Sequence, residues 1–429
     1  MPQGGSLRRR EEDDLLDLKP LPLILCFAAA LALSLLNFLT IAAVLPDLIR
    51  SWSLNKTQAG WLVGVYFAGY MSAILFVASL TDRVDPRRIY LIGAAIGGLS
   101  SLALALFANG FWLTMVLRFM GGVAFTGVYM PGLRALTDSL PPAQRNRGIV
   151  YYSSCFALGS GFSIFAAGRI AAVLDWRWAF VVAAAGSFAA MALVAVVLRP
   201  RAPAGSSLAQ SAAKPPARSQ WASYKQVWRN RRAVGYIVAM YGVGWEVFAF
   251  RSWIVTYLTE RQGLEAGQTF WLSPPDVAFA SAIIGIPASV WIGEWAARIN
   301  RERLLIATAL VSLVLDISLA AAVSLPYGVL FLLCFAFSLT SFGRSAATTA
   351  GMMHAAQDEV RGATMAAHSF MAFLSGISSP LIFGLMLDVS ALATGRVSWT
   401  VGFSSLAIGS AISIAGYLLA RSAKPLDQS

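Results

Sequence analysis

Long apolar runs, separated by short polar segments, dominate the whole of this chain. Each run has about 20–27 residues, enough for a helix to cross the hydrocarbon core of a bilayer. Within that core a single segment can satisfy its backbone N–H and C=O groups only by forming a helix. The pattern predicts an all-α membrane protein with 12 transmembrane helices at residues 21–46, 59–80, 89–108, 111–134, 148–172, 178–198, 233–258, 276–297, 304–325, 327–352, 363–388 and 399–420.

Two charged hairpins occupy equivalent places in the two halves of the chain. ASLTDRVDPRR, at Ala78–Arg88, and GEWAARINRER, at Gly293–Arg303, each separate two apolar runs and lie roughly 215 positions apart. The pairs Arg147-Gly148 and Arg361-Gly362 recur at nearly the same spacing. A short charged segment between two membrane-length runs forms a loop at the bilayer surface. The chain is therefore interpreted as two copies of one unit of roughly 200 residues.

The first hairpin resembles G-x-L-a-D-r-x-G-r-k, the signature between helices 2 and 3 of the major facilitator superfamily. The matching residues are Leu80, Asp82, Arg83 and Arg87, whereas Ala78, Asp85 and Pro86 depart from the signature. The second hairpin keeps Gly293, Arg298 and Arg301 but has Ala297 where the aspartate belongs. Both copies, at the expected spacing in a chain of 12 spans, identify the chain as similar to this superfamily over about residues 20–420.

The resemblance implies two six-helix bundles that rock around one central cavity at the membrane midplane. Lysine and arginine gather on one side of the predicted membrane, about 24 of the 33 with both termini placed in the cytoplasm. The expected organisation is a cytoplasmic tail (1–20), a first bundle (21–198), a cytoplasmic linker (199–232), a second bundle (233–420) and a final tail (421–429).

The hairpins are expected to act as latches between the bundles on the cytoplasmic side. Asp82 is placed to bond the neighbouring arginines and the N-terminus of a helix of the other bundle, because a carboxylate is stabilised there. The second hairpin lacks the aspartate, so its latch is expected to be weaker. The predicted gating residues are Asp82, Arg83, Arg87, Arg298 and Arg301.

Composition excludes several other classes of protein. The chain is 57% hydrophobic and only 13% charged, against about 25% charged residues in soluble domains. Its net charge of +12 lies in loops between apolar spans without a basic aromatic patch, which argues against nucleic-acid binding. The three cysteines lie in apolar runs, the two histidines show no zinc spacing, and no ATP-binding motif occurs. We expect neither an enzyme nor a cofactor-binding protein.

Ionisable residues inside spans are functional candidates, because each is costly there unless it is paired or hydrated. Glu246 lies near the middle of the seventh span, and the resemblance places that span and the tenth against the central cavity. Arg344, in the tenth span, is a better ion-pair partner for Glu246 than Arg251, which is about 140° further round the same helix. Glu246 is therefore a candidate protonatable switch, or one member of a permanent ion pair. Asp316 competes for Arg344 and is more plausibly structural.

Three further residues are candidates for the binding site. Arg118 and Gly122 match the span-4 motif R-x-x-q-G of the superfamily, which implies proton coupling or bracing; the alternative is an arginine bonded to backbone carbonyls of a neighbouring span. Arg251 either attracts an anion or extends to the outer headgroups. Asn37 is expected to bind substrate or to hydrogen-bond a neighbouring helix. The candidate substrate- and proton-binding residues are Asn37, Arg118, Glu246, Arg251 and Arg344.

These observations favour a secondary transporter in the bacterial inner membrane, acting as a monomer on a small-molecule substrate with protons as the coupling ion. The spans hold about one more positive than negative charge, which favours a small anion as the substrate. The alternative is proton-driven efflux of lipophilic or cationic compounds, although the span-5 glycine motif of antiporters lacks its proline. A transport-inactive sensor or assembly protein on the same scaffold is the alternative of another class.

Overall fold

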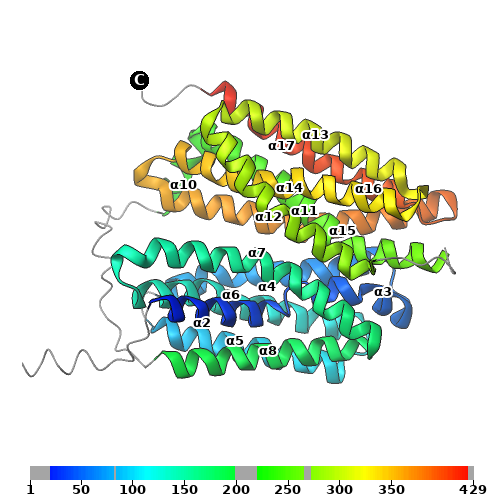
Figure 1. Cartoon of the computed structure of the whole chain (residues 1–429), viewed down its shortest axis with the longest axis horizontal. Helices are drawn as coiled ribbons and strands as arrows, with labels where there is room; N and C mark the ends of the chain where they lie inside the picture. The colour runs from blue at the N-terminus through cyan, green and yellow to red at the C-terminus, as the bar shows by residue number, and fades with distance from the viewer. Residues whose placement is uncertain (1–19, 82–83, 199–219, 265–271, 424–429) are drawn as a thin grey trace, which may run out of the picture.

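The first half of the chain folds into one bundle of helices. The computed structural model describes residues 20–81, 84–198, 220–264 and 272–423 (Figure 1). Asp82, Arg83, most of both tails and the 199–219 part of the linker lie outside the described residues. The spans of this bundle are α2 (Pro20–Leu35) with α3 (Thr40–Trp52), α4 (Lys56–Leu80), α5 (Pro86–Phe107), α6 (Phe111–Ser139), α7 (Pro142–Val173) and α8 (Trp176–Val197).

The second half forms a similar bundle, preceded by the short helix α10 (Gln220–Arg229). Its spans are α11 (Arg231–Leu264), α12 (Pro274–Arg298), α13 (Arg301–Ala321), α14 (Tyr327–Ala355), α15 (Arg361–Thr394) and α16 (Trp399–Ser404) with α17 (Leu406–Ser422). In the described part of the chain, 11 spans are long and apolar enough to cross a membrane, and α4, with 25 residues, is a twelfth of membrane length. The predicted all-α membrane protein with 12 helices in two six-helix bundles is confirmed.

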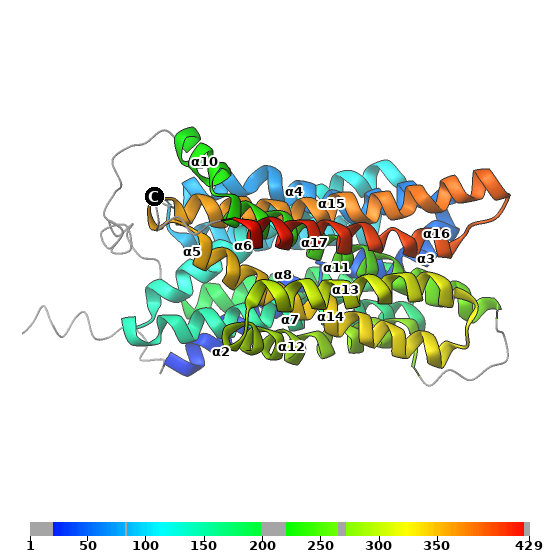
Figure 2. The same cartoon turned by 90° about the horizontal axis from the view of Figure 1, so that it is seen from above.

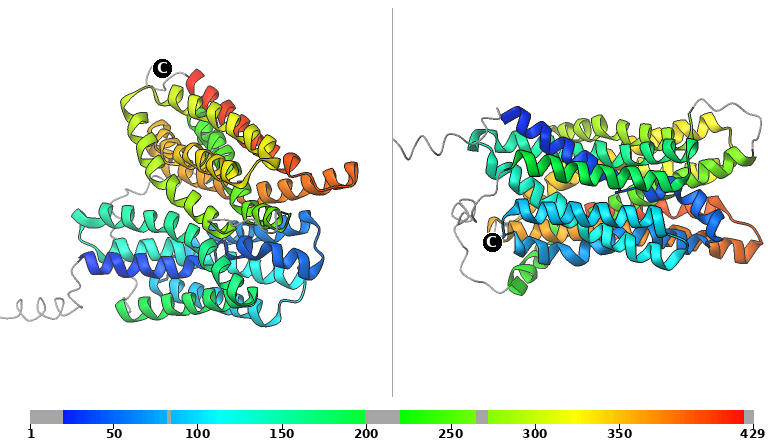
Figure 3. Two further views of the ribbon diagram at one scale, coloured as in Figure 1. Left: turned by 45° about the vertical axis from the view of Figure 1, so that its right-hand side comes forward. Right: turned by 90° about the horizontal axis from the view of Figure 1, so that it is seen from below.

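The two bundles lie side by side, with their helices running along the long axis of the molecule (Figures 1 and 2). We call the end that holds Pro20 and Ser422 the terminal end. The opposite end, which holds Trp52 and Leu264, is the distal end. In the left-hand view of Figure 3 the bundles converge toward the distal end and diverge toward the terminal end.

Helices α4 and α15 make a close contact between the bundles. A Cβ atom on Gly60 would overlap the carbonyl oxygen of Pro380, so only glycine permits this approach. Further along α4, the ring of Phe67 lies 4.7 Å from that of Phe248 in α11, and Tyr70 lies 4.4 Å from Phe373 in α15. The bundles therefore meet through small residues near the distal end and through aromatic rings nearer the middle.

The first span differs from the sequence prediction of one helix over 21–46. It is interrupted between Leu35 and Thr40, and it continues to Trp52. An interruption frees backbone carbonyls that a continuous helix would pair, and such groups need other donors when they are buried. The donor is Arg118, which lies about 80 positions further along the chain, so the local sequence of the span gives no signal of the interruption.

Candidate functional site

Glu246 in α11 and Arg344 in α14 form a buried ion pair. Arg344 Nη2 lies 2.5 Å from Glu246 Oε2, and both side chains are fully buried (0% exposed). The pairing expected from the sequence is present in the structure. A buried ion pair is retained only when further hydrogen bonds satisfy its remaining polar atoms. The surroundings of Glu246 supply these bonds.

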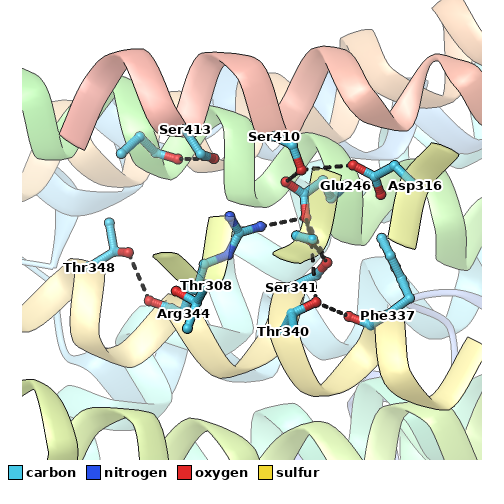
Figure 4. A network of polar contacts seen from close by, with 12 residues as sticks. Glu246, Thr308, Asp316, Phe337, Thr340, Ser341, Arg344, Thr348, Ser410 and Ser413 are labelled. Carbon is cyan, nitrogen blue, oxygen red and sulfur yellow. Dashed lines mark hydrogen bonds and ion pairs between the residues drawn. The ribbon is translucent and has the colours of Figure 1, made fainter. Parts of the chain in front are cut away.

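Three serine hydroxyls surround the Glu246 carboxylate (Figure 4). Ser312 of α13 and Ser341 of α14 donate to Oε2 at 2.8 and 2.6 Å, and Ser410 of α17 contacts Oε1 at 2.8 Å. These helices all belong to the second bundle, so the network lies inside that bundle. From the resemblance, Glu246 and Arg344 were expected to lie against a central cavity. In the structure, the hydrogen-bond partners of Glu246 come instead from helices of its own bundle.

Helix geometry explains why Glu246 faces the interior of its bundle. Gly409 of α17 packs against α11, where an added Cβ would lie 2.9 Å from Glu246 Cγ. Because this position carries no side chain, α17 approaches closely and brings the adjacent Ser410 onto the carboxylate. Arg251, about 140° further round α11, consequently points to a different neighbour.

Asp316 of α13 joins the same network through Ser410. Its Oδ2 lies 2.7 Å from Ser410 Oγ, and its side chain is fully buried. Glu246 lies between Asp316 and the Arg344 guanidinium (Figure 4). Asp316 thus does not displace Glu246 as the partner of Arg344. Within the described residues, Asp316 Oδ1 and the Nε and Nη1 groups of Arg344 are buried without a hydrogen-bond partner.

Arg251 lies between the two bundles. Its Nη1 donates to Ser160 Oγ of α7 at 3.0 Å, and its guanidinium stands 4.3 Å from the ring centre of Phe342 in α14. The side chain is only 7% exposed, so it does not extend to headgroups. Among the described residues no carboxylate pairs with it, and its Nε is buried without a partner. Within the described residues, the contacts of this positive charge at the interface are a neutral hydroxyl and an aromatic ring.

Arg118 in α6 supports the interruption of the first span. Its Nη1 donates to Asn37 O at 2.9 Å and contacts Asn37 Oδ1 at 3.4 Å, while Nη2 donates to Phe38 O at 3.3 Å. The guanidinium also stacks 4.5 Å from the ring centre of Tyr66. The geometry matches the alternative of an arginine bonded to carbonyls of a neighbouring span. Asn37 is its partner at the interruption.

Replacing Arg118 with Met is expected to lower the free energy of unfolding by about 2–4 kcal/mol. The carbonyls of Asn37 and Phe38 would lose charged hydrogen bonds, each worth about 1.5–3 kcal/mol, while they stay buried. Thermal unfolding of the detergent-purified protein measures the loss. Arg177→Met, at an exposed arginine beside Asp175, should change stability by less than about 0.5 kcal/mol. Equal stability of the two variants would contradict the bracing role.

The distal end carries charged contacts between the bundles that sequence analysis missed. Asp388 of α15 accepts from the backbone N–H groups of Lys56 and Thr57 at 3.0 and 2.8 Å, and from the Thr57 hydroxyl at 2.6 Å. These groups form the N-terminus of α4, where an anion is stabilised by the helix dipole. Lys56 Nζ also lies 2.5 Å from Glu260 Oε1 of α11.

A second ion pair at this end joins α7 to α12, where Arg169 Nε lies 3.1 Å from Asp276 Oδ1. We call these contacts, formed by Lys56, Thr57, Arg169, Glu260, Asp276 and Asp388, the distal latch. One feature of the sequence could have pointed to Asp388, because it is a charged residue at the edge of an apolar run. Nothing in the sequence indicated its partners, because they lie in the other half of the chain.

The predicted gating residues lie at the terminal end or outside the described residues. Arg87 Nη2 donates to Ala195 O of α8, in the same bundle, at 2.8 Å. Arg298 is exposed, and Arg301 is half-buried. Asp82 and Arg83 belong to the undescribed stretch. The latch role assigned to these five residues stays a prediction.

Comparison with known proteins agrees with this fold. The sequence profile of the Major Facilitator Superfamily matches residues 26–380, and the chain belongs to this family of membrane transporters. The chain is 22% identical over 254 residues to the niacin transporter NiaP of Acinetobacter baylyi, covering 54% of this chain and 57% of that protein. It is 24% identical over 244 residues to the probable sulfoacetate transporter SauU of Cupriavidus necator, covering 53% and 54%.

The matched stretch thus spans about half the length of these curated relatives. Among solved structures, a bacterial homolog of the human lysosomal transporter Spinster, in an inward-facing and unoccupied conformation, superposes with a TM-score of 0.76. It is 15% identical and covers 94% of this chain and 98% of its own. This structural similarity shows that the two proteins share a fold.

Proposed function

We propose that this protein is a secondary active transporter that moves a small organic anion across the bacterial inner membrane by proton-coupled alternating access. The observation that carries the proposal is Arg251. A buried cation with no carboxylate among its described partners lies between the two bundles, where a substrate held by both would bind. Niacin is a carboxylate at neutral pH and sulfoacetate is a dianion, which supports an anionic substrate.

The other candidate residues receive different roles in this proposal. Arg118 and Asn37 brace the interrupted first span, and Glu246 with Arg344 forms the core of a proton-coupling network in the second bundle. With both termini in the cytoplasm, the distal latch closes the outer side of a monomeric transporter. Asp82, Arg83, Arg87, Arg298 and Arg301 would then form the inner latch after the bundles rock.

A thermal-shift panel tests the substrate class. Niacin or sulfoacetate at 100 times its dissociation constant should stabilise the purified protein by about 2.7 kcal/mol, because a ligand that binds only the folded state shifts the unfolding equilibrium. Arg251→Gln should abolish the shift, and Arg177→Gln, at an exposed site, should keep it. A shift that persists in Arg251→Gln would contradict the assignment of Arg251. Uptake of the same anions into proteoliposomes distinguishes a transporter from a sensor.

The aromatic rings between the bundles favour a second candidate function, efflux of lipophilic or cationic compounds. Across the interface, Phe67 contacts both Phe248 and Phe373, and Tyr70 packs on Phe373. Such rings stack on apolar molecules and attract cations. Stabilisation by lipophilic amines but not by the two anions would support this function over anion transport.

A further inference from the structure

The network around Glu246 contains more short oxygen–oxygen contacts than ionised carboxylates permit. Ser410 Oγ lies 2.8 Å from Glu246 Oε1 and 2.7 Å from Asp316 Oδ2. A serine hydroxyl has one hydrogen and can donate to only one of these oxygens. The other contact needs a hydrogen from the carboxyl group itself. We propose that Asp316 is the proton-binding site of this protein, and that it holds one proton in the conformation seen here.

The contacts decide which carboxyl group carries the proton. Glu246 Oε2 faces the Arg344 guanidinium and the hydroxyls of Ser312 and Ser341, and its other oxygen faces Ser410. These donors all stabilise the ionised form of Glu246. Asp316 contacts a single hydroxyl in the described structure, and its Oδ1 has no partner there. The proton therefore lies on Asp316 Oδ2 and is donated to Ser410, while Ser410 donates to Glu246.

Charge balance leads to the same assignment. Glu246, Asp316 and Arg344 are all fully buried. Two ionised carboxylates against one guanidinium would leave a net negative charge inside an apolar bundle, which is costly. One proton on Asp316 makes the three side chains neutral as a group. No other cation in the described residues contacts either carboxylate.

In the part of the chain that the structure describes, the helices packed against α13 bring no further ionisable group to Asp316. Helix α17 contributes Tyr417, whose hydroxyl bonds Thr348, and α14 contributes Arg344. Helix α16 carries no ionisable side chain. The ionisable side chains of α12 lie near its ends and are Asp276, Glu294 and Arg298.

Loss of the proton from Asp316 would change how helices of the second bundle are held together. This part of the proposal rests on the proposed transport function. When Asp316 releases its proton to water, two carboxylates compete for one guanidinium. Arg344 has Nε and Nη1 without a partner in the described structure, so it can turn toward Asp316 without giving up another bond. Asp316 lies on α13, Glu246 on α11 and Arg344 on α14. If Arg344 shares its ion pair between Glu246 and Asp316, the contacts that hold these three helices together therefore change.

Infrared spectroscopy of the purified protein tests the proton directly and needs no substrate. At neutral pH the wild type should show the carbonyl band of a protonated, hydrogen-bonded carboxylic acid. The band should be lost in Asp316→Asn and kept in Asp47→Asn, a matched change at a carboxylate that pairs with Arg50 within α3 and does not connect the bundles. Ser410→Ala should keep the band but shift it toward the position of an acid without a hydrogen bond.

Absence of the band in the wild type, or its survival in Asp316→Asn, would overturn the assignment. A band that disappears in Glu246→Gln while Asp316→Asn keeps it would place the proton on Glu246 instead. Because this measurement involves no transported solute, a protein that failed to move anions would still pass or fail it. Failure here is thus distinguishable from failure of the proposed function.

The link to helix movement is tested with spin labels at Ser51→Cys and Leu392→Cys, at the exposed distal ends of α3 and α15, after replacement of the three native cysteines. Alkaline pH should lengthen the distance between the labels in the wild type, as the distal end opens. Asp316→Asn, which mimics the protonated acid, should keep the short distance at every pH. The same pH response in both proteins would refute the link.

Discussion

A protein in which Glu246 and Asp316 are both replaced by their amides is expected to unfold roughly 6–20 °C below the wild type. Arg344 would then be a fully buried cation without a carboxylate partner in the described structure. Removal of one side of a buried ion pair costs about 3–5 kcal/mol. For a unit of 150–250 residues, each kcal/mol shifts the midpoint by about 2–4 °C. Thermal unfolding of the purified protein measures the shift.

The losses of stability in the two single variants should not sum to the loss in the double variant. Asp316→Asn keeps the Glu246–Arg344 pair and should be close to the wild type in stability. In Glu246→Gln, release of the proton proposed for Asp316 would replace the lost counter-charge, so the loss of stability should be moderate. The coupling between the two positions is expected to be about 0.5–3 kcal/mol, the range for residues in one polar network. Additive single effects would contradict a shared role of the two carboxyl groups.

Arg344→Met provides the control for this experiment. When it is added to the double variant, the unpaired cation disappears and stability should recover, because apolar replacements of a buried ion pair are often neutral or stabilising. Transport should stay lost in this triple variant. Such a protein would separate the contribution of the network to folding from its contribution to coupling.

The sequence was sufficient for the spans and for one long-range contact. Uninterrupted apolar runs give helices because the bilayer leaves the backbone no other partner. The rarity of charges inside spans favoured Arg344 as the partner of Glu246, while it left open whether Glu246 is a protonatable switch or part of a permanent ion pair. The face on which Glu246 lies did not follow, because it depends on how closely α17 approaches α11 at Gly409. Serines such as Ser410 are common in membrane helices, so their place in the network carried no sequence signal.

Two other features depend on partners that lie far away in the chain. The interruption of the first span contains no glycine or proline, and it is stabilised by Arg118 from α6. Asp388 of α15 finds its donors at the start of α4, more than 300 positions earlier. Hydrophobic periodicity reports only local burial, so it cannot show which helix ends meet. Such contacts require the three-dimensional arrangement of both bundles.

Helix α11 carries both Glu246 and Arg251 and presents them to different neighbours. Glu246 faces the interior of its own bundle, whereas Arg251 faces the other bundle. The two positions are five residues apart, so a shift or rotation of α11 moves both together. A change in the network proposed to bind a proton would in this way alter the position of the cation proposed to hold the substrate.

Weakening of the distal latch is expected to open the distal end. Asp388→Asn removes a negative charge that accepts three hydrogen bonds at the N-terminus of α4. Charged hydrogen bonds contribute about 1.5–3 kcal/mol, and the helix dipole adds about 0.3–1 kcal/mol. Since 1.4 kcal/mol is a factor of ten, a loss of about 1.8–4 kcal/mol should raise the population with an open distal end roughly 20- to 700-fold. The labels at Ser51→Cys and Leu392→Cys report it as a growing population of longer distances.

Asp47→Asn is the matched control at the same end. Asp47 pairs with Arg50 within α3 at 3.0 Å, with Arg50 exposed and Asp47 partly exposed, and such surface pairs contribute about 0–1 kcal/mol. This variant should leave the distance distribution unchanged, because the pair does not connect the bundles. If Asp388→Asn behaves like Asp47→Asn, the charged contacts of Asp388 do not hold the end closed. The glycine-mediated packing of α4 against α15 at Gly60 would then be the feature that does.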